Sequence, residues 1–390
     1  VEIIRIDGRP VIFNGAAFES LIVVPANKVD EARKLIASAP GESATETSQH
    51  VDGLLVTCRR AVALPESTRR ELSHLDAKVR CYESHPVYFP QKGESLFYSS
   101  AEIINLSEQR SQSLGQLALA HEAQLLGMSE NDVIEEMLRR YDIMKLSVEK
   151  GLELDFTGLQ LLPSCAGAIF QAESEGKLAT QSLHTRAAAR ALAVMHVDAA
   201  MGVVCAAPTG GSAGVVPGTL VTLVEERELS RDEIARAMLA AGAIGMILAI
   251  RGTFAAEVAG CQVEIGASGA MAAAAVVDAV GGSAKQACDA AAICFQNTMG
   301  TVCDLLHGMV EIPCHTRNGA AAASAFVNAD LVLGGYPNLS PLDETIDAVD
   351  AVGLAMPSEL RCTSKGGLAV TPSAQALQPK CCGSGCIGCG

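Results

Sequence analysis

The most apolar stretch of this 390-residue sequence is AMLAAGAIGMILAI, at residues 237–250. It is too short to cross a bilayer, which takes about 20 apolar residues. Much of it is alanine and glycine, and such small side chains let neighbouring helices pack closely. The stretch therefore predicts a buried helix inside a helical core, and no membrane span.

The segments on either side of this stretch, from about residue 99 onward, also carry helical patterns. In a capping box, an N-cap side chain and an acceptor three residues later satisfy each other's backbone groups. Three such boxes mark helix starts: Ser129 with Asp132, Ser230 with Glu233, and Ser283 with Gln286. Ser340 followed by Pro341 indicates a fourth start. We expect an all-helical domain at residues 96–375.

The first 95 residues follow a different pattern. Short β-branched runs alternate there with segments of helical spacing; the runs are VEIIRI, PVIFNG, SLIVVP and GLLVTC, and the helical segments are NKVDEARKLIASA and ESTRRELSHL. This order predicts a small α/β domain at residues 1–95, with an exposed polar loop at 39–50. The expected fold class is thus mainly α, with this small domain first and a cysteine-rich tail at 376–390.

Charge and cysteine content narrow the class of function. The formal charge is −15, acidic and basic residues are interspersed, and no run of Lys or Arg is present. This balance disfavours nucleic acid and anionic membranes as partners, so a small molecule is the expected ligand. The first residues show no signal-peptide pattern. Fourteen cysteines without a secretion signal fit a reducing compartment, and we expect a cytoplasmic protein.

Three cysteines, Cys261, Cys303 and Cys314, are the main candidates for chemistry. Two are separated by ten residues and the third lies upstream on another predicted element, so the three could converge. Converging thiolates bind soft metals, and three protein ligands leave one position open for a substrate. From the spacing alone, inert buried thiols that act as small hydrophobic residues are the commoner interpretation.

A glycine-rich segment, PTGGSAG at residues 208–214, follows an apolar run. Its backbone N–H groups and the hydroxyls of Thr209 and Ser212 could hold a carboxylate. It lacks the Gly-Lys-Ser/Thr ending of a nucleotide-binding loop, and by itself it is more often an ordinary turn. Polar residues near the three cysteines need partners if buried: a substrate or supporting role is open for Arg317 and Asn318, and a structural role is favoured for Asn297 and Glu264.

Several segments closely resemble the alpha portion of the iron-sulfur-dependent L-serine dehydratases. They are FYSSAEIINLSE, MKLSVEKGL, PTGGSAG before VVPG, GCQVEIG, NTMG, CDLLHGMVEIPC before HTRN, and ELRCTSKGGLA, within residues 96–372. The resemblance implies a 4Fe-4S cluster held by Cys261, Cys303 and Cys314, with one iron left to meet the substrate. It also implies that the substrate amino acid is held by Thr209, Gly210 and Ser212.

The C-terminal tail, QPKCCGSGCIGCG, holds Cys381, Cys382, Cys386 and Cys389. Glycines between the thiols make it flexible enough to wrap a metal. In the dehydratases a cysteine near the C-terminus can fold back onto the open iron, which implies this role for Cys389. The alternatives are a separate metal site made by the tail and a disordered end.

The sequence departs from this family at several places. Leu305 stands where proline is usual, and His307 and His315 stand where the family has other residues. The Ser-Ser-His-Thr motif of the family's beta portion is not found, and Ser84-His85-Pro86 is only a faint echo of it. The general base is therefore unassigned, with His85 and His184 as remaining candidates; for His184, as for His196, a structural role on a helix is commoner.

The expected activity is that of a hydro-lyase and ammonia-lyase that converts L-serine to pyruvate and ammonia. One alternative is a related 4Fe-4S lyase with another substrate, such as a cysteine desulfidase or another hydroxy acid dehydratase. A non-enzymatic metal or iron-sulfur carrier is a second alternative, for which the tail is the best argument. We expect a homo-oligomer. Either the short N-terminal domain substitutes for the missing portion, or a separate beta-type subunit supplies it, or the chemistry differs.

Overall fold

The computed structural model describes residues 18–380 apart from residues 42, 51–52, 61–62 and 85–92. The chain divides into two compact units, Val1–Gly93 and Glu94–Gly390. Each unit has its own hydrophobic core.

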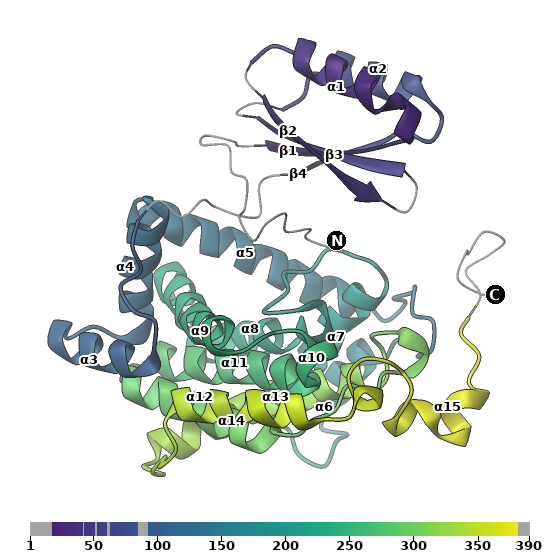
Figure 1. Cartoon of the computed structure of the whole chain (residues 1–390). Coiled ribbons are helices and arrows are strands. Elements are labelled where there is room, and N and C mark those ends of the chain that lie inside the picture. The colour runs from purple at the N-terminus through teal and green to yellow at the C-terminus, as the bar shows by residue number, and fades with distance from the viewer. Residues whose placement is uncertain (1–17, 42, 51–52, 61–62, 85–92, 381–390) are drawn as a thin grey trace. The chain divides into compact units, whose positions relative to one another are not determined.

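The small unit is an antiparallel sheet with two helices on one of its faces (Figure 1). The elements follow in the order β1 (Phe18–Val24), α1 (Val29–Ser38), β2 (Ser43–His50), β3 (Gly53–Arg60), α2 (Glu66–Leu75) and β4 (Arg80–Ser84). The strand order in the sheet is β2-β3-β1-β4. This is the βαββαβ arrangement of ferredoxin-like folds. Apolar residues of the two central strands, among them Ile22 and Val56, pack against Ile36 and Leu72 of the helices.

The prediction of a loop at residues 39–50 was wrong. Residues Ser43–His50 form strand β2, which pairs with β3 from Ser43 opposite Arg60 to His50 opposite Gly53. In the described part of the sheet β2 is an edge strand, and its sequence, SATETSQH, has no apolar alternation that would mark a buried face. The predicted runs VEIIRI and PVIFNG lie outside the described residues, whereas both predicted helices are confirmed.

The large unit is helical in its described part, as the sequence predicted (Figure 1). All three predicted capping boxes are present, at the starts of α5, α9 and α12. The fourth predicted start is also a helix, which begins directly after Pro341. The α-helices are α3 (Ser100–Arg110), α4 (Leu114–Leu126), α5 (Glu130–Gly151), α6 (Ala166–Ser174), α7 (Leu183–Ala199), α8 (Val215–Arg227), α9 (Arg231–Arg251), α10 (Ala256–Ala259), α11 (Ile265–Ala279), α12 (Ala284–Thr298), α13 (Cys314–Leu333), α14 (Leu342–Ala355) and α15 (Pro372–Ala376).

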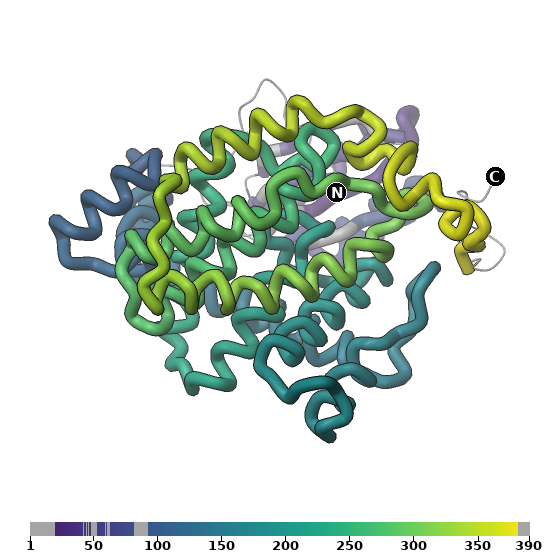
Figure 2. The backbone as a smooth tube through the Cα atoms, turned by 90° about the horizontal axis from the view of Figure 1, so that it is seen from below, coloured from purple at the N-terminus to yellow at the C-terminus, as the bar shows by residue number. Residues whose placement is uncertain are grey.

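Helix α11 lies at the centre of this unit. Every residue from Ile265 to Asp278 is buried, and the helix contacts α8, α9, α12 and α13. Helix α12 contacts both α13 and α14, and these three helices, green to yellow in Figure 2, run alongside one another. Small residues permit this closeness: a Cβ on Gly218 of α8 would lie 2.7 Å from the carbonyl oxygen of Ala187 in α7. The alanine- and glycine-rich composition thus lets the helices pack closely, as the sequence predicted.

The apolar stretch at residues 237–250 belongs to helix α9. By length and hydropathy this helix could cross a membrane, but 67% of its most apolar window is buried inside the structure. It packs against α4, α5 and α11. The prediction of a buried core helix is confirmed.

Three helices begin close to one another. Helix α8 follows a 3-10 turn at Gly210–Ser212, α11 follows one at Cys261–Val263, and α13 begins at Cys314. The first turn contacts both α11 and α13. The N-terminal ends of helices carry partial positive charge and unpaired N–H groups. The fold therefore directs three such ends toward one region.

Candidate metal centre

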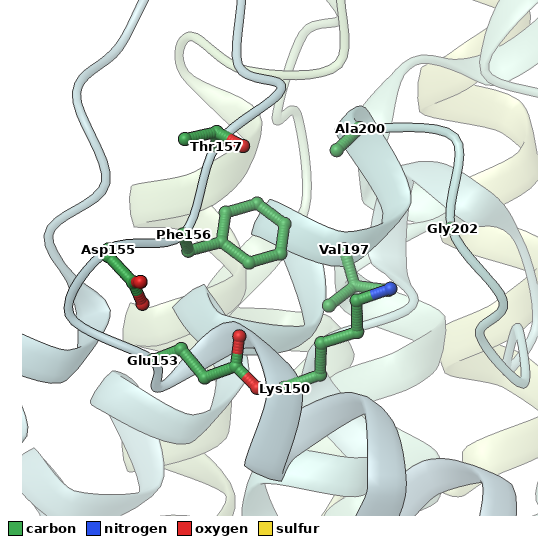
Figure 3. A pocket seen from close by; sticks show the side chains of 8 residues that line it. All are labelled: Lys150, Glu153, Asp155, Phe156, Thr157, Val197, Ala200 and Gly202. Atoms are coloured by element: carbon green, nitrogen blue, oxygen red, sulfur yellow. The ribbon is translucent and has the colours of Figure 1, made fainter.

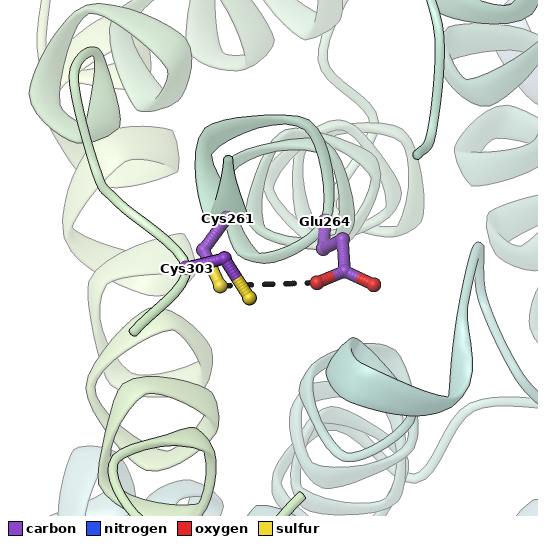
Figure 4. Close-up of side chains that lie close together, drawn as sticks. All are labelled: Cys261, Glu264 and Cys303. Carbon is purple, nitrogen blue, oxygen red and sulfur yellow. Dashed lines mark hydrogen bonds between the residues drawn. The ribbon is translucent and has the colours of Figure 1, made fainter. Parts of the chain in front are cut away.

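Two of the predicted cysteines meet a carboxylate at this region. The ligand atoms of Cys261, Cys303 and Glu264 all lie within 4.8 Å of one another (Figure 4). The Cys261 thiol is 3.8 Å from Oε2 of Glu264, and the two cysteine side chains are 3% and 1% exposed. Soft thiols with a carboxylate in a buried space form a donor set for a metal.

Backbone pairing holds Cys303 in place. Its N–H donates to the carbonyl of Leu360 at 2.8 Å, and its carbonyl accepts from the N–H of Cys362 at 2.9 Å. The preceding loop is tied to the 3-10 turn of Cys261, because the N–H of Gln262 donates to the carbonyl of Thr301 at 3.1 Å. Cys303 and Cys261 are therefore positioned by hydrogen bonds between segments far apart in the sequence.

Cys314 is the first residue of α13 and is buried, with 4% of its surface exposed. Burial raises the pKa of its thiol to about 12, and the neighbouring Cys261 and Glu264 add to this shift. The pKa of Cys303 is also raised, first by its hydrogen bonds to Cys261 and Cys362 and then by burial. Such a group of thiols cannot ionise together unless a cation balances the charge. The residues present thus fit a thiolate-bound metal or iron-sulfur cluster.

Arg317 lies next to these thiols but is held by the protein itself. Its guanidinium donates to the carbonyl of Val302 and to Oδ1 of Asp304, each at 2.8 Å. It also hydrogen-bonds to Cys261, and its pKa is raised, although burial works in the opposite direction. The positive charge of Arg317 is therefore placed beside the candidate ligands.

The glycine-rich segment at residues 208–214 lies against the same centre. Thr209 Oγ1 donates to Oε1 of Glu264 at 2.8 Å and lies 3.1 Å from the Ser212 hydroxyl. Because Thr209 gives its hydrogen to the carboxylate, the Ser212 hydroxyl donates to Thr209. The pKa of Glu264 is raised by burial, and the bond from Thr209 partly offsets this rise. The segment and the centre are thus linked by one chain of hydrogen bonds.

A second carboxylate borders the same segment. A Cβ on Gly210 would lie 3.4 Å from Oδ1 of Asp198, and one on Gly211 would lie 3.0 Å from Oε1 of Glu264. Burial raises the pKa of Asp198 to about 6. Gly210 therefore lies beside the carboxylate of Asp198, and Gly211 lies beside that of Glu264.

Asn318 joins the segment to the start of α13. Its Oδ1 accepts from the N–H of Gly214 at 3.0 Å, and its Nδ2 donates to the carbonyls of Gly211 and Cys314 at 2.9 and 2.8 Å. The residue is 0% exposed. All of these bonds are to the backbone, so Asn318 fixes the position of the segment relative to Cys314.

The described histidines lie in different surroundings. His315 and His196 are buried, with ring centroids 5.3 Å apart; the pKa of His315 is lowered to about 3, first by burial and then by His196. His307 Nε2 is 2.9 Å from the carbonyl oxygen of Ala374. His184 makes an edge contact with Phe326. His85 and the four tail cysteines, including Cys389, lie outside the described residues.

A pocket lies beside His196. Phe156 lines the pocket (Figure 3). Its ring stacks on that of His196, with 5.7 Å between the ring centroids. The other lining residues come from the end of α5, the loop after it and the end of α7: Lys150, Glu153, Asp155, Thr157, Val197, Ala200 and Gly202. Neither the three cysteines nor the segment at 208–214 contributes to this pocket.

Sequence reasoning missed three residues near the centre. Glu264 was expected to be structural, and Cys362 and Asp198 were not singled out. Asn297, also expected to be structural, donates to Asn328 Oδ1 at 3.0 Å. The only signal for Cys362 was its place in the segment ELRCTSKGGLA, because its pairing with Cys303 is long-range.

The helical core of small residues and the buried thiols near the helix starts define a helical protein with a buried, thiol-rich candidate metal centre. The sequence profile of the family "Serine dehydratase alpha chain" matches residues 99–369, and the chain belongs to this family. The resemblance found in the sequence motifs is thereby confirmed.

Curated relatives agree with this assignment. The chain is 36% identical to a "Probable L-serine dehydratase, alpha chain" of Bacillus subtilis over 285 residues, which is 73% of this chain and 95% of that protein. It is 34% identical to the "L-serine dehydratase, alpha chain" of Peptoniphilus asaccharolyticus over 281 residues, 72% of this chain and 96% of the relative. With "L-serine dehydratase 1" of Escherichia coli the identity is 32% over 282 residues, 70% of this chain and 62% of the relative.

Proposed function

We propose that this protein is the alpha-type chain of an L-serine dehydratase, a lyase that converts L-serine to pyruvate and ammonia. The observation that carries the proposal is the grouping of Cys261, Cys303 and Cys314 in one buried region at the joined starts of helices. Family membership indicates the class of reaction, because two relatives that this chain matches over nearly their whole length are named L-serine dehydratases.

We propose that a 4Fe-4S cluster is held by these three thiolates. When bound, such a cluster supplies a Lewis-acidic iron that makes the substrate hydroxyl a better leaving group. The buried cysteines exclude water from this position, and the guanidinium of Arg317 beside Cys261 balances negative charge. The partial positive charge at the N-terminus of α13 also favours thiolate at Cys314.

The segment at residues 208–214 is the proposed substrate cradle. The hydroxyl hydrogens of Ser212 and Thr209 are used in a chain that ends on Glu264, so a substrate carboxylate would accept hydrogen bonds from the backbone N–H groups of this segment. Asp198, on the other side of Gly210, carries the charge that an α-ammonium group requires. Arg317 and Asn318 support the cradle and the centre through their bonds to the backbone and to Asp304.

We infer that a beta-type chain completes the active enzyme. Two of the relatives are named alpha chains, and the Escherichia coli relative is longer than the region that this chain matches. His184 packs against Phe326 on α13, so the general base is to be sought at His85, which lies outside the described residues, or in the beta-type chain. A reducing compartment such as the cytoplasm suits ten described cysteines that are all free thiols.

Anaerobic reconstitution with iron and sulfide, followed by measurement of pyruvate release, tests this function. L-Serine should be turned over faster than L-threonine or L-cysteine, with a beta-type chain added if the chain alone is inactive. Faster release of sulfide from L-cysteine would favour a desulfidase. A fully loaded centre without turnover of any of these amino acids, in the presence of the beta-type chain, would favour a metal carrier.

A further inference from the structure

Three side chains with metal-binding atoms lie next to one another outside the cysteine centre. Cys165 is the N-cap of α6, His196 lies on α7, and His315 is the second residue of α13. The thiol of Cys165 is 3.7 Å from Nε2 of His196, and the rings of His196 and His315 are 5.3 Å apart between centroids. Sulfur and imidazole nitrogen are donors that zinc and similar metals prefer.

Both separations fit a single tetrahedral ion. Zinc binds thiolate sulfur at about 2.3 Å and imidazole nitrogen at about 2.0–2.1 Å. At a tetrahedral angle these bond lengths put sulfur and nitrogen about 3.6 Å apart and the centroids of two bound rings about 5.2 Å apart; the observed values are 3.7 and 5.3 Å. The three donor atoms do not yet all lie within 4.8 Å of one another, so binding requires a rotation of at least one side chain.

The two imidazoles are buried without a full set of hydrogen bonds. His196 and His315 are 0% and 1% exposed. Neither ring nitrogen of His315 makes a well-formed hydrogen bond within the described part of the chain, although the Met195 backbone lies close enough to act on it. Nδ1 of His196 is in the same situation beside the backbone of Gly151. Such buried nitrogens are costly, and a bound ion or water is a common explanation for them.

The surroundings of His196 favour a metal ion. Burial lowers the pKa of His196, so its ring is neutral at pH 7 and keeps a lone pair for a metal. Glu311, which is 2% exposed, acts on this ring electrostatically. Its carboxylate accepts the N–H groups of residues 160–162 at 2.6, 3.0 and 2.8 Å, which positions the loop that leads to Cys165. A Cys165 thiolate and the Glu311 carboxylate together would balance the charge of a divalent ion.

We propose that Cys165, His196 and His315 bind one divalent ion of the zinc type, at a site distinct from the cysteine centre. On binding, the Cys165 thiol releases its proton to solvent, because the thiolate is the metal ligand. Cys165 is partly exposed, so water completes the fourth position. The ion joins the loop before α6 to α7 and α13 and stabilises the folded chain. None of the three residues belongs to the proposed cluster or cradle, so the site does not depend on the proposed function.

Zinc binding to the full-length protein tests the proposal. The protein is first loaded with its cluster under anaerobic conditions, so that the cysteine centre is filled, and is then titrated with Zn²⁺ while zinc and iron contents are measured together. Cys165→Ser and His196→Gln should each weaken zinc binding at least about tenfold at unchanged iron content, since even an outer-shell partner contributes about 10–100-fold. His184→Gln, on the same helix α7, is the matched control and should bind zinc as the parent does. Zn²⁺ should also raise the unfolding temperature of the parent but not that of Cys165→Ser.

X-ray absorption at the zinc edge identifies the ligands in the parent without any substitution. We expect one sulfur at about 2.3 Å and two imidazole nitrogens at about 2.0–2.1 Å. A shell made mainly of sulfur would assign the ion to other cysteines and overturn the inference. Equal zinc affinity in the parent and Cys165→Ser would do the same, as would a parent that retains no zinc. Pyruvate release from the same samples tests the dehydratase separately, so either proposal can fail while the other stands.

Discussion

Asn318 offers a sharp test of how the centre is held together. Its side chain makes three hydrogen bonds, to the N–H of Gly214 and to the carbonyls of Gly211 and Cys314, within a fully buried environment. Asn318→Ala removes all three. Each buried group left without its partner costs about 1–3 kcal/mol, so the loss of three partners lowers the unfolding free energy by on the order of 3–9 kcal/mol. A water molecule in the vacated space would put the loss near the lower limit.

Asn318→Asp distinguishes hydrogen bonding from simple packing. The variant has nearly the same shape and keeps an acceptor for Gly214, but it directs an oxygen at two carbonyl oxygens that now lie 2.8 and 2.9 Å from Nδ2. We therefore expect it to be no more stable than Asn318→Ala at neutral pH. Both variants should also retain less iron after reconstitution, because the bond that joins the glycine-rich segment to Cys314 is lost.

Urea unfolding of the metal-free protein, followed by circular dichroism, measures these changes. Ser324→Ala, on the same helix, is the control, since the Ser324 hydroxyl bonds only to the carbonyl of Ala321 within that helix. Its cost should stay within about 0.5 kcal/mol, as for most substitutions away from such features. A stability of Asn318→Asp within about 1 kcal/mol of the parent would refute the reasoning, since an unpaired buried group costs at least that much.

Three further outcomes follow from the geometry. Cys303→Ser should lose iron-sulfur absorbance and activity together, whereas Cys81→Ser, in the small unit, should keep both; full iron content in the first variant would contradict the assignment. Thr209→Val removes the charge-assisted hydrogen bond, worth about 1.5–3 kcal/mol, that holds Glu264 against residues 208–214. It should lower kcat/KM about 10–100-fold with iron content intact, and unchanged kinetics would return residues 208–214 to the status of a turn. Burial raises the pKa of Asp198 from 3.8 to about 6, so the folded protein keeps a proton that the unfolded chain has lost, and its stability falls as the pH rises through this window. Asp198→Asn should remove this slope and stabilise the metal-free protein at pH 7 by up to about 3 kcal/mol; a melting temperature with the parent's pH dependence would exclude Asp198 as its source.

The helices could be predicted from the sequence because their signals are local. The capping boxes at Ser129, Ser230 and Ser283 involve residues three positions apart, and each marks a helix start in the structure. Strand β2 was missed for the opposite reason. Among the described residues it pairs with β3 alone, and its polar sequence carries no local sign of that pairing.

The same distinction applies to the metal centre. Cys261, Cys303 and Cys314 could be singled out from the sequence because their segments carry the family's motifs. The spacing of the three residues alone did not show that they lie close together. Cys362 and Asp198 approach the centre only through tertiary structure: one by pairing with Cys303, the other at the end of α7 beside Gly210. No spacing in the sequence indicates either contact.

The small-residue composition and the position of the metal centre are physically connected. The starts of α8, α11 and α13 can share hydrogen bonds only if these helices approach closely. A Cβ on Gly214 would lie 2.3 Å from the carbonyl oxygen of Ala191 in α7, and one on Gly269 would lie 2.7 Å from the thiol of Cys294 in α12. Larger residues at such crossings would separate the helices and, with them, the segment at 208–214 from Cys314. The alanine and glycine that predict the helical core are thus also what brings distant cysteines to one centre.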